Sequence, residues 1–209
     1  MMKKIKLLSC IAFIIVLTSC ERKYDWSPSE CAPQHYPAKI LTNNFQYKNG
    51  GGVGTLGRVA GGMGWGRVGA GYAVGERLKP VPDSLFVNWF SITEGKFYKG
   101  KFKLSNKVLE KNLKAGKSSY VYTCFAPHGR VVVYVAGKHG RAPIDRFRAI
   151  EDTSITVTKY RLKNAQVQSI EQYIEEYGKA YRPDSLYLRG LISKEDSIYI
   201  SKHGIPDTW

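Results

Sequence analysis

The chain has 209 residues, of which 43% are hydrophobic, 12% aromatic and 23% charged. This composition is typical of a globular protein with a packed core, and it excludes a disordered chain, a collagen-like chain and a protein that crosses a membrane many times. The 32 Lys and Arg residues outnumber the 17 Asp and Glu residues, and the formal net charge is +15. Such a charge indicates either an acidic surface nearby or a compartment in which the charge is tolerated.

The first twenty residues have the pattern of an export signal. Three lysines within residues 1–6 precede an apolar run over residues 7–17, and Leu17-Thr18-Ser19 ends at Cys20. The run is shorter than the roughly 20 residues that cross a bilayer as a helix, so we expect residues 1–19 to be removed as a signal peptide. The segment resembles the bacterial lipoprotein signal, in which Cys20 receives a diacylglycerol and becomes the first residue. The alternative is an ordinary secretory signal in which Cys20 is incidental.

The lipoprotein interpretation predicts a cell-envelope protein held on a membrane by its N-terminal lipid. The three acyl chains of such lipoproteins exceed the two anchors that stable membrane attachment requires. Glu21 follows Cys20, and under the enterobacterial sorting rule a residue other than Asp directs the protein to the outer membrane. The sequence does not distinguish the periplasmic face from the outer surface.

The basic residues are concentrated in one part of the chain. Residues 31–144 contain 17 basic and 4 acidic residues, whereas residues 145–209 contain 10 of each. Export would separate the protein from cytosolic DNA and RNA, so we expect no nucleic-acid partner. Lipid phosphates, lipopolysaccharide or an acidic protein remain as partners.

Two cysteines, Cys31 and Cys124, remain after the signal and its lipidated cysteine are set aside. An even pair in an oxidising compartment is compatible with a disulfide that ties the start of the domain to a central strand. The alternative is an exposed Cys31 and a buried Cys124 that do not meet.

Residues 20–37 contain three prolines among polar neighbours, and we interpret them as the lipidated cysteine and a tether. A single β-rich domain follows over residues 38–209, with a strand at 38–47 and twelve glycines in residues 50–75. Gly52 to Gly57 and Gly64 to Gly69 both match the dinucleotide pattern G-x-G-x-x-G. Neither is followed by a helix-forming run or by an acidic residue before Glu76, so we expect no nucleotide cofactor there.

Short runs rich in β-branched and aromatic residues follow from residue 82 onward. They predict strands at 85–92, 96–104, 119–126, 131–136, 144–150 and 155–160. Helical patterns occur at about 106–115 and 165–181. Turns that launch strands are expected at Pro82-Asp83-Ser84, again at Pro183-Asp184-Ser185 and, in part, at Asp196-Ser197. The predicted fold class is therefore α+β, with a mainly antiparallel β sheet and two helices in a single domain.

Residues 85–100 combine an acid, a base, a hydroxyl group and two aromatic rings. Trp89 and Ser91 share one strand face, and a tight return at Gly95 brings Lys96 and Tyr98 back beside them. The candidate binding residues are Trp89, Ser91, Glu94, Lys96, Tyr98, Lys99, Lys101 and Lys103. The alternative is that Trp89 and Tyr98 are core residues, that Glu94 and Lys96 form a weak exposed ion pair, and that the last three lysines form a solvated face.

This segment also resembles a known family. Pro82-Asp83-Ser84-Leu85, then Trp89-Phe90-Ser91, Glu94 and Lys96-Phe97-Tyr98, is similar to the core pattern of bacterial lipoproteins grouped as domain of unknown function 2931. The late Gly204-Ile205-Pro206 and Trp209 fit the same pattern, whereas the glycine-dense segment departs from it. The family has no established activity. Some relatives are encoded beside secreted phospholipase toxins, which implies an immunity role for those members.

Common catalytic and metal-binding patterns are absent from the sequence. There is no G-x-S-x-G, H-E-x-x-H or S-x-x-K, and three of the four histidines precede a glycine, as turn residues do. We therefore expect no catalytic residues, no cofactor and no metal site, and a lipoprotein that binds an acidic protein toxin. The alternatives are an envelope structural or anionic-lipid-binding lipoprotein, and a hydrolase that uses Glu94 with a distant histidine.

Overall fold

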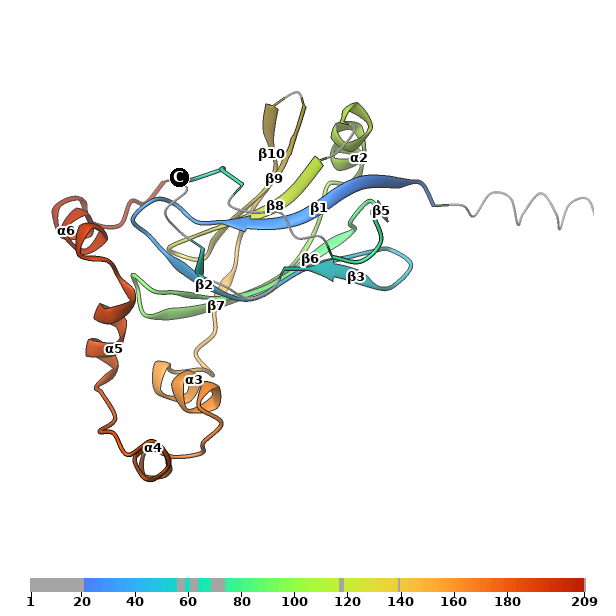
Figure 1. Cartoon of the computed structure of the whole chain (residues 1–209). Coiled ribbons are helices and arrows are strands. Elements are labelled where there is room, and N and C mark those ends of the chain that lie inside the picture. The colour runs from blue at the N-terminus through green and yellow to red at the C-terminus, as the bar shows by residue number, and fades with distance from the viewer. Residues whose placement is uncertain are drawn as a thin grey trace, which may run out of the picture.

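A computed structural model describes residues 21–55, 59–60, 64–68, 74–116, 119–138 and 140–208. The predicted signal peptide, the predicted lipidation site at Cys20 and a large part of the glycine-rich segment therefore lie outside the described residues. In the part that is described, two β sheets stack face to face, and four helices extend from one end of the pair (Figure 1).

The first sheet has five strands in the order β10-β9-β8-β1-β5. These strands are β10 (Gly140–Arg148), β9 (Arg130–Gly137), β8 (Ser119–Ala126), β1 (Lys23–Cys31) and β5 (Leu78–Pro80). The pair β1–β8 is parallel and the other pairs are antiparallel. Residues 23–31, which the sequence placed in a tether, are therefore an interior strand of this sheet.

The second sheet has the order β11-β7-β6-β2-β3, and β4 also pairs with β2. Its strands are β11 (Ile150–Glu151), β7 (Lys96–Lys103), β6 (Ser84–Ser91), β2 (Ala38–Gln46), β3 (Gly52–Gly54) and β4 (Val59–Ala60). All of these pairs are antiparallel. The expected strands at 38–47, 85–92 and 96–104 occur with end shifts of one residue.

The core lies between the sheets, because alternate residues of each strand point to the same side. Large buried side chains of the first sheet meet those of the second: Trp26, Val121, Phe125 and Val133 face Ile40, Phe45, Leu85 and Trp89. A polar contact crosses this core. The Thr123 hydroxyl donates to Asn43 Oδ1 at 2.8 Å, and Asn43 Nδ2 donates to the carbonyl of Ser29 at 3.2 Å.

Helix α2 (Asn106–Ala115) packs Leu109 and Leu113 against the core beside the first sheet. The C-terminal helices are α3 (Val157–Asn164), α4 (Ile170–Tyr177), α5 (Asp184–Leu191) and α6 (Lys194–His203). Residues of α3 and α5 cover Phe90 and Phe97 on the outer face of the second sheet. None of the described helices is long and apolar enough to cross a membrane.

The predicted fold class is wrong in its sheet and helix content. The described chain contains two sheets rather than one, and five helices rather than two. The expected helix at 106–115 is present as α2. The expected helix at 165–181 is shorter, since Ser169 caps α4 by accepting from Gln172 N, and the preceding Gln166 has a left-handed backbone with φ of 60°.

Three expected strands at 155–160, 183–188 and 196–200 are helices α3, α5 and α6. Thr156 accepts from Lys159 N and Ser193 accepts from Asp196 N, so each hydroxyl caps a helix instead of starting a strand. Packing of Tyr160 against Phe90 and Phe97 also outweighs the β-branched composition around residues 155–158.

Candidate binding surface

The predicted lysine stripe lies on the outer face of the second sheet. Lys99, Lys101 and Lys103 follow Phe97 at intervals of two, so all share its outward side of β7. The strand register places Lys99 opposite Asn88 and Lys101 opposite Phe86. The C-terminal helices lie below one end of the sheet and leave the other end uncovered (Figure 1). We call this uncovered area the lysine face; it consists of Phe86, Asn88, Lys99, Lys101, Lys103 and Ile150.

A groove of about 330 Å³ runs along the lysine face. It is lined by Phe86, Lys99, Gly100, Lys101, Phe102, Arg148, Ala149 and Ile150. Three of these residues are basic and none is acidic. Phe86 is 39% exposed and Ile150, which lies opposite Lys99 on β11, is 66% exposed. The groove therefore combines positive charge with accessible apolar side chains.

The positive charges of this area are only partly compensated. Lys99 Nζ lies 3.0 Å from Asp152 Oδ1, and Lys103 pairs with Asp83. The pKa of Asp152 is lowered by a hydrogen bond from the Ser154 hydroxyl and, next, by that from Lys99. Within the described ranges, Lys101 and Arg148 form no ion pair. These two side chains therefore carry the charge that is free to meet a partner.

Arg148 is the groove residue that sequence reasoning missed. It lies at the end of β10, 47 positions after Lys101, and the short crossing from β10 to β11 brings it to the edge of the second sheet. Arg148 lies within the strand predicted at 144–150, but the sequence did not indicate which sheet the end of this strand would approach.

Three of the predicted binding residues point away from this surface. Trp89, Ser91 and Tyr98 are buried on the core side, and the rings of Trp89 and Tyr98 stack with centroids 5.2 Å apart. The register pairs Trp89 with Tyr98 and Ser91 with Lys96, as the tight return at Gly95 predicted. These three predicted binding residues therefore lie inside the sandwich and not on the lysine face, because the period of two turns them toward the core.

Glu94 and Lys96 are close in sequence but bind different groups. Lys96 Nζ lies 2.9 Å from Glu151 Oε2, and this hydrogen bond raises the Lys96 pKa. Glu94 Oε1 accepts from the Tyr98 hydroxyl at 2.9 Å, and both of its oxygens lie 3.1 Å from the backbone nitrogen of His128. Burial, followed by the neighbouring Glu94 charge, raises the pKa of Tyr98. The expected Glu94–Lys96 ion pair is therefore absent here.

Glu94 fastens the β8–β9 turn to the β6–β7 hairpin. Its side chain is 6% exposed, and Oε1 lies 3.3 Å from Nδ1 of His128. His128 has a left-handed backbone with φ of 61°, and a side chain at the next residue, Gly129, would lie 2.5 Å from the carbonyl of Ala149. The pair required by the hydrolase hypothesis thus exists, but both carboxylate oxygens already accept hydrogen bonds that hold this turn.

The two cysteines form a disulfide between the parallel strands β1 and β8. Both are buried, and Cys31 and Cys124 are directly opposite in the strand register. The sequence left this pairing open. The structure explains it, because the fold places the two strands that carry Cys31 and Cys124 side by side.

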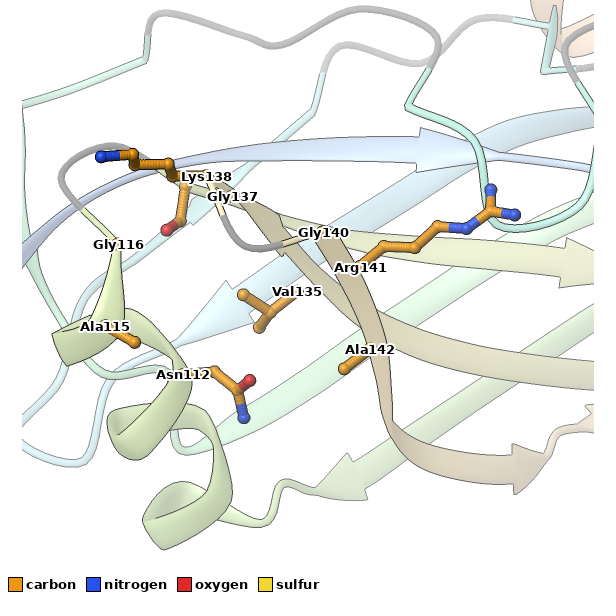
Figure 2. A pocket seen from close by; sticks show the side chains of 10 residues that line it. Asn112, Ala115, Gly116, Val135, Gly137, Lys138, Gly140, Arg141 and Ala142 are labelled. Atoms are coloured by element: carbon orange, nitrogen blue, oxygen red, sulfur yellow. The ribbon is translucent and has the colours of Figure 1, made fainter.

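A metal site and a small pocket beside α2 are two further candidates, and neither is well supported. No group of three or more His, Cys, Asp or Glu side chains among the described residues could hold a metal ion. A pocket between α2 and the β9–β10 hairpin has a volume of about 90 Å³ and is lined by Asn112, Lys138 and Arg141, among others (Figure 2). This volume holds only about three water molecules.

The chain matches a family model described as "Protein of unknown function (DUF2931)" over residues 16–207. It matches no curated protein. No solved structure matches it either. Because the family match covers nearly the whole sequence, and because the pattern at residues 82–98 forms the β6–β7 hairpin at the centre of the second sheet, the chain belongs to this family of proteins of unknown function.

Proposed function

We propose that this protein is a lipid-anchored binding protein of the bacterial envelope and that its lysine face docks an acidic protein. The observation that carries the proposal is the groove in which Lys101 and Arg148 lie beside Phe86 and Ile150. Protein interfaces are enriched in arginine and aromatic residues at their centres, and complementary charges guide the partners together.

The distribution of charge favours a protein over a membrane surface. Lys99 and Lys103 already have carboxylate partners, so of the four basic side chains at the lysine face and its groove only Lys101 and Arg148 form no ion pair within the described residues. Attraction to anionic lipids grows with the number of basic residues near the surface, and clusters of four to eight are typical. Two cations beside an apolar groove are too few for a typical lipid-binding cluster. They match a protein surface on which one or two carboxylates lie beside apolar side chains.

The most specific form of the proposal is an immunity protein that neutralises a secreted phospholipase toxin. Three features support it: the lipoprotein signal, the resemblance to relatives encoded beside such toxins, and the cationic groove. A lipid anchor would hold the binding domain at the membrane on which a phospholipase acts. Binding an acidic region of the toxin through the lysine face would block its access to lipid.

A contact competition tests this function. The parent strain competes against a strain in which this gene is deleted, and the assay is repeated with the secretion systems of the parent disabled. We expect killing of the deletion strain only by the secretion-competent parent, and rescue by the restored gene. Survival of the deletion strain beside a parent that expresses the toxin would contradict the immunity role. Sedimentation of the protein with anionic vesicles, lost in Lys101→Glu, would instead favour the lipid-binding alternative.

A further inference from the structure

A second pocket lies far from the lysine face, at the end of the sandwich near α6. Its volume is about 550 Å³, within the range of small-molecule sites in proteins. Segments from five parts of the chain line it: residues 33–36 between β1 and β2, residues 64–67, Arg141 of β10, Tyr199 of α6 and Pro206. Figure 1 shows α6 and the C-terminal end beside one another at this end of the molecule. The pocket shares no lining residue with the groove.

Two arginines give the pocket a positive charge. Arg67 and Arg141 line it, and none of the residues that line it is acidic. Arg141 is held in place because its Nη1 donates to the carbonyl of Gly66 at 2.8 Å, and Figure 2 shows the side chain extending away from α2. The Tyr122 hydroxyl donates to the same carbonyl at 2.7 Å. Arg67 is exposed and forms no ion pair within the described ranges. Guanidinium groups bind phosphate through paired, charge-assisted hydrogen bonds.

His35 is fixed at the wall of this pocket by three features. Its backbone is left-handed with φ of 71°, its Nδ1 lies 2.7 Å from Asp196 Oδ1, and its ring stacks on Tyr199 with centroids 3.9 Å apart. Strained backbone of this kind persists where the surrounding contacts hold it, and it clusters at ligand sites. Since Nδ1 faces the carboxylate, Nε2 is the ring nitrogen that is left to meet a ligand.

The remaining lining residues suit a ring with hydroxyl groups. Trp65 is the half-buried aromatic side chain of the lining, whereas Tyr36 is buried and the Tyr199 ring stacks on His35. The Gln34 amide carries both donors and an acceptor. Aromatic faces pack against the apolar face of a sugar ring, while amide and imidazole groups pair with its hydroxyls. We infer that this pocket binds a phosphorylated sugar, with Arg67 and Arg141 on the phosphate and Trp65 against the ring.

Isothermal titration calorimetry of the full chain in detergent tests the inference, with glucosamine 1-phosphate, glucosamine, inorganic phosphate and adenosine 5′-phosphate as probes. We expect saturable binding of glucosamine 1-phosphate that is at least tenfold tighter than that of either part alone. Equal binding of inorganic phosphate would overturn the inference, because the ring would contribute nothing. Tighter binding of adenosine 5′-phosphate, or no binding of the sugar phosphate, would also overturn it.

Variants then locate the site. Arg67→Gln should weaken binding of glucosamine 1-phosphate about tenfold or more, because it removes charge-assisted hydrogen bonds, and Arg67→Lys should weaken it less. Arg146→Gln, at an exposed position of β10 that lines neither the pocket nor the groove, is the matched control and should leave binding unchanged. The exposed Arg67 has little part in folding, and thermal unfolding of each variant checks this. Unchanged affinity in Arg67→Gln and Arg141→Gln would contradict the assignment.

The same phosphate chemistry occurs in free sugars and in glycolipid headgroups. Vesicles that carry a phosphorylated glycolipid, compared with phosphatidylcholine vesicles, distinguish these sources. Binding to the glycolipid vesicles that soluble glucosamine 1-phosphate displaces would assign the site to a headgroup. Binding of the soluble sugar phosphate alone would assign it to a free sugar.

Discussion

The carboxylate of Glu94 accepts hydrogen bonds from the backbone nitrogen of His128, 34 residues later, with both oxygens 3.1 Å away. This contact joins the β6–β7 hairpin of one sheet to the β8–β9 turn of the other. It also shows how the family pattern at residues 82–98 supports the fold, since Tyr98 donates to the same carboxylate.

Replacing Glu94 with Gln should therefore destabilise the protein. The amide loses the charge that strengthens the bonds from Tyr98 and His128, and its NH₂ group meets another donor. We expect a loss of about 1–3 kcal/mol in the free energy of unfolding, measured by urea denaturation. Glu176→Gln, at an exposed position of α4, is the control and should change stability by less than about 0.5 kcal/mol. A Glu94→Gln protein as stable as this control would contradict the holding role.

Asn43 and Thr123 connect the two sheets across the core. Asn43 is 1% exposed and Thr123 is fully buried, so removing either partner leaves a buried polar group unsatisfied. We expect Thr123→Val and Asn43→Leu each to cost about 1–3 kcal/mol. In the double variant the cost should be clearly smaller than the sum, because both polar partners are gone. Additive costs in this double-mutant cycle would show that the contact contributes no coupling.

The disulfide between Cys31 and Cys124 closes a loop with a sequence separation of 93. Cross-links that close long loops reduce the conformational freedom of the unfolded chain, so removing both cysteines should cost about 2–4 kcal/mol. Urea unfolding of a Cys31→Ala, Cys124→Ala variant measures this cost. Dithiothreitol should lower the stability of the unmodified chain and leave that of the variant unchanged. Equal stability of the two proteins without reductant would contradict the stabilising role.

The hydrogen bonds of Asp152 predict a pH dependence of stability. Bonds from Ser154 and then Lys99 lower its folded-state pKa below the ordinary value of 3.8. A lowered folded pKa stabilises the native state above the unfolded pKa, and this stabilisation is lost as the pH falls through the folded pKa. Asp152→Asn should therefore be less stable than the unmodified chain at pH 5–7. The difference should shrink steadily below pH 3.8. A difference that is constant from pH 7 to pH 2 would contradict this explanation.

The sequence predicted strands better than helices for a physical reason. The period of two in β6 and β7 fixed both their length and the lysine side of β7, because a sheet with one apolar face leaves little choice of register. By contrast, the disulfide did not follow from a local pattern, since Cys31 and Cys124 lie 93 residues apart and the sequence left their pairing open. Similarly, helix α3 is stabilised by packing against Phe90 and Phe97, which lie about 60 residues earlier in the chain. The β-branched residues at its start therefore led to the wrong prediction of a strand.

The groove could not be predicted in full from the sequence, because it also forms through a contact between residues that are far apart in the chain. Lys99 and Lys101 could be placed on one face from the sequence, but Arg148 joins them only because β10 ends beside the second sheet. Trp89 and Tyr98 were singled out for their residue types, whereas the structure uses them as core aromatics. Residue type alone does not separate an aromatic core residue from an aromatic binding residue, since both are large and apolar.

The central claim is that Lys101 and Arg148 bind an acidic protein partner. It is tested most directly by restoring the deleted gene as a Lys101→Glu, Arg148→Glu variant and measuring survival beside the secretion-competent parent. The control is Lys111→Glu, an exposed position on α2 at the first sheet, with immunoblots to confirm equal amounts in the envelope. We predict that the control protects as well as the original gene and that the double variant does not. Full protection by the double variant would contradict the claim.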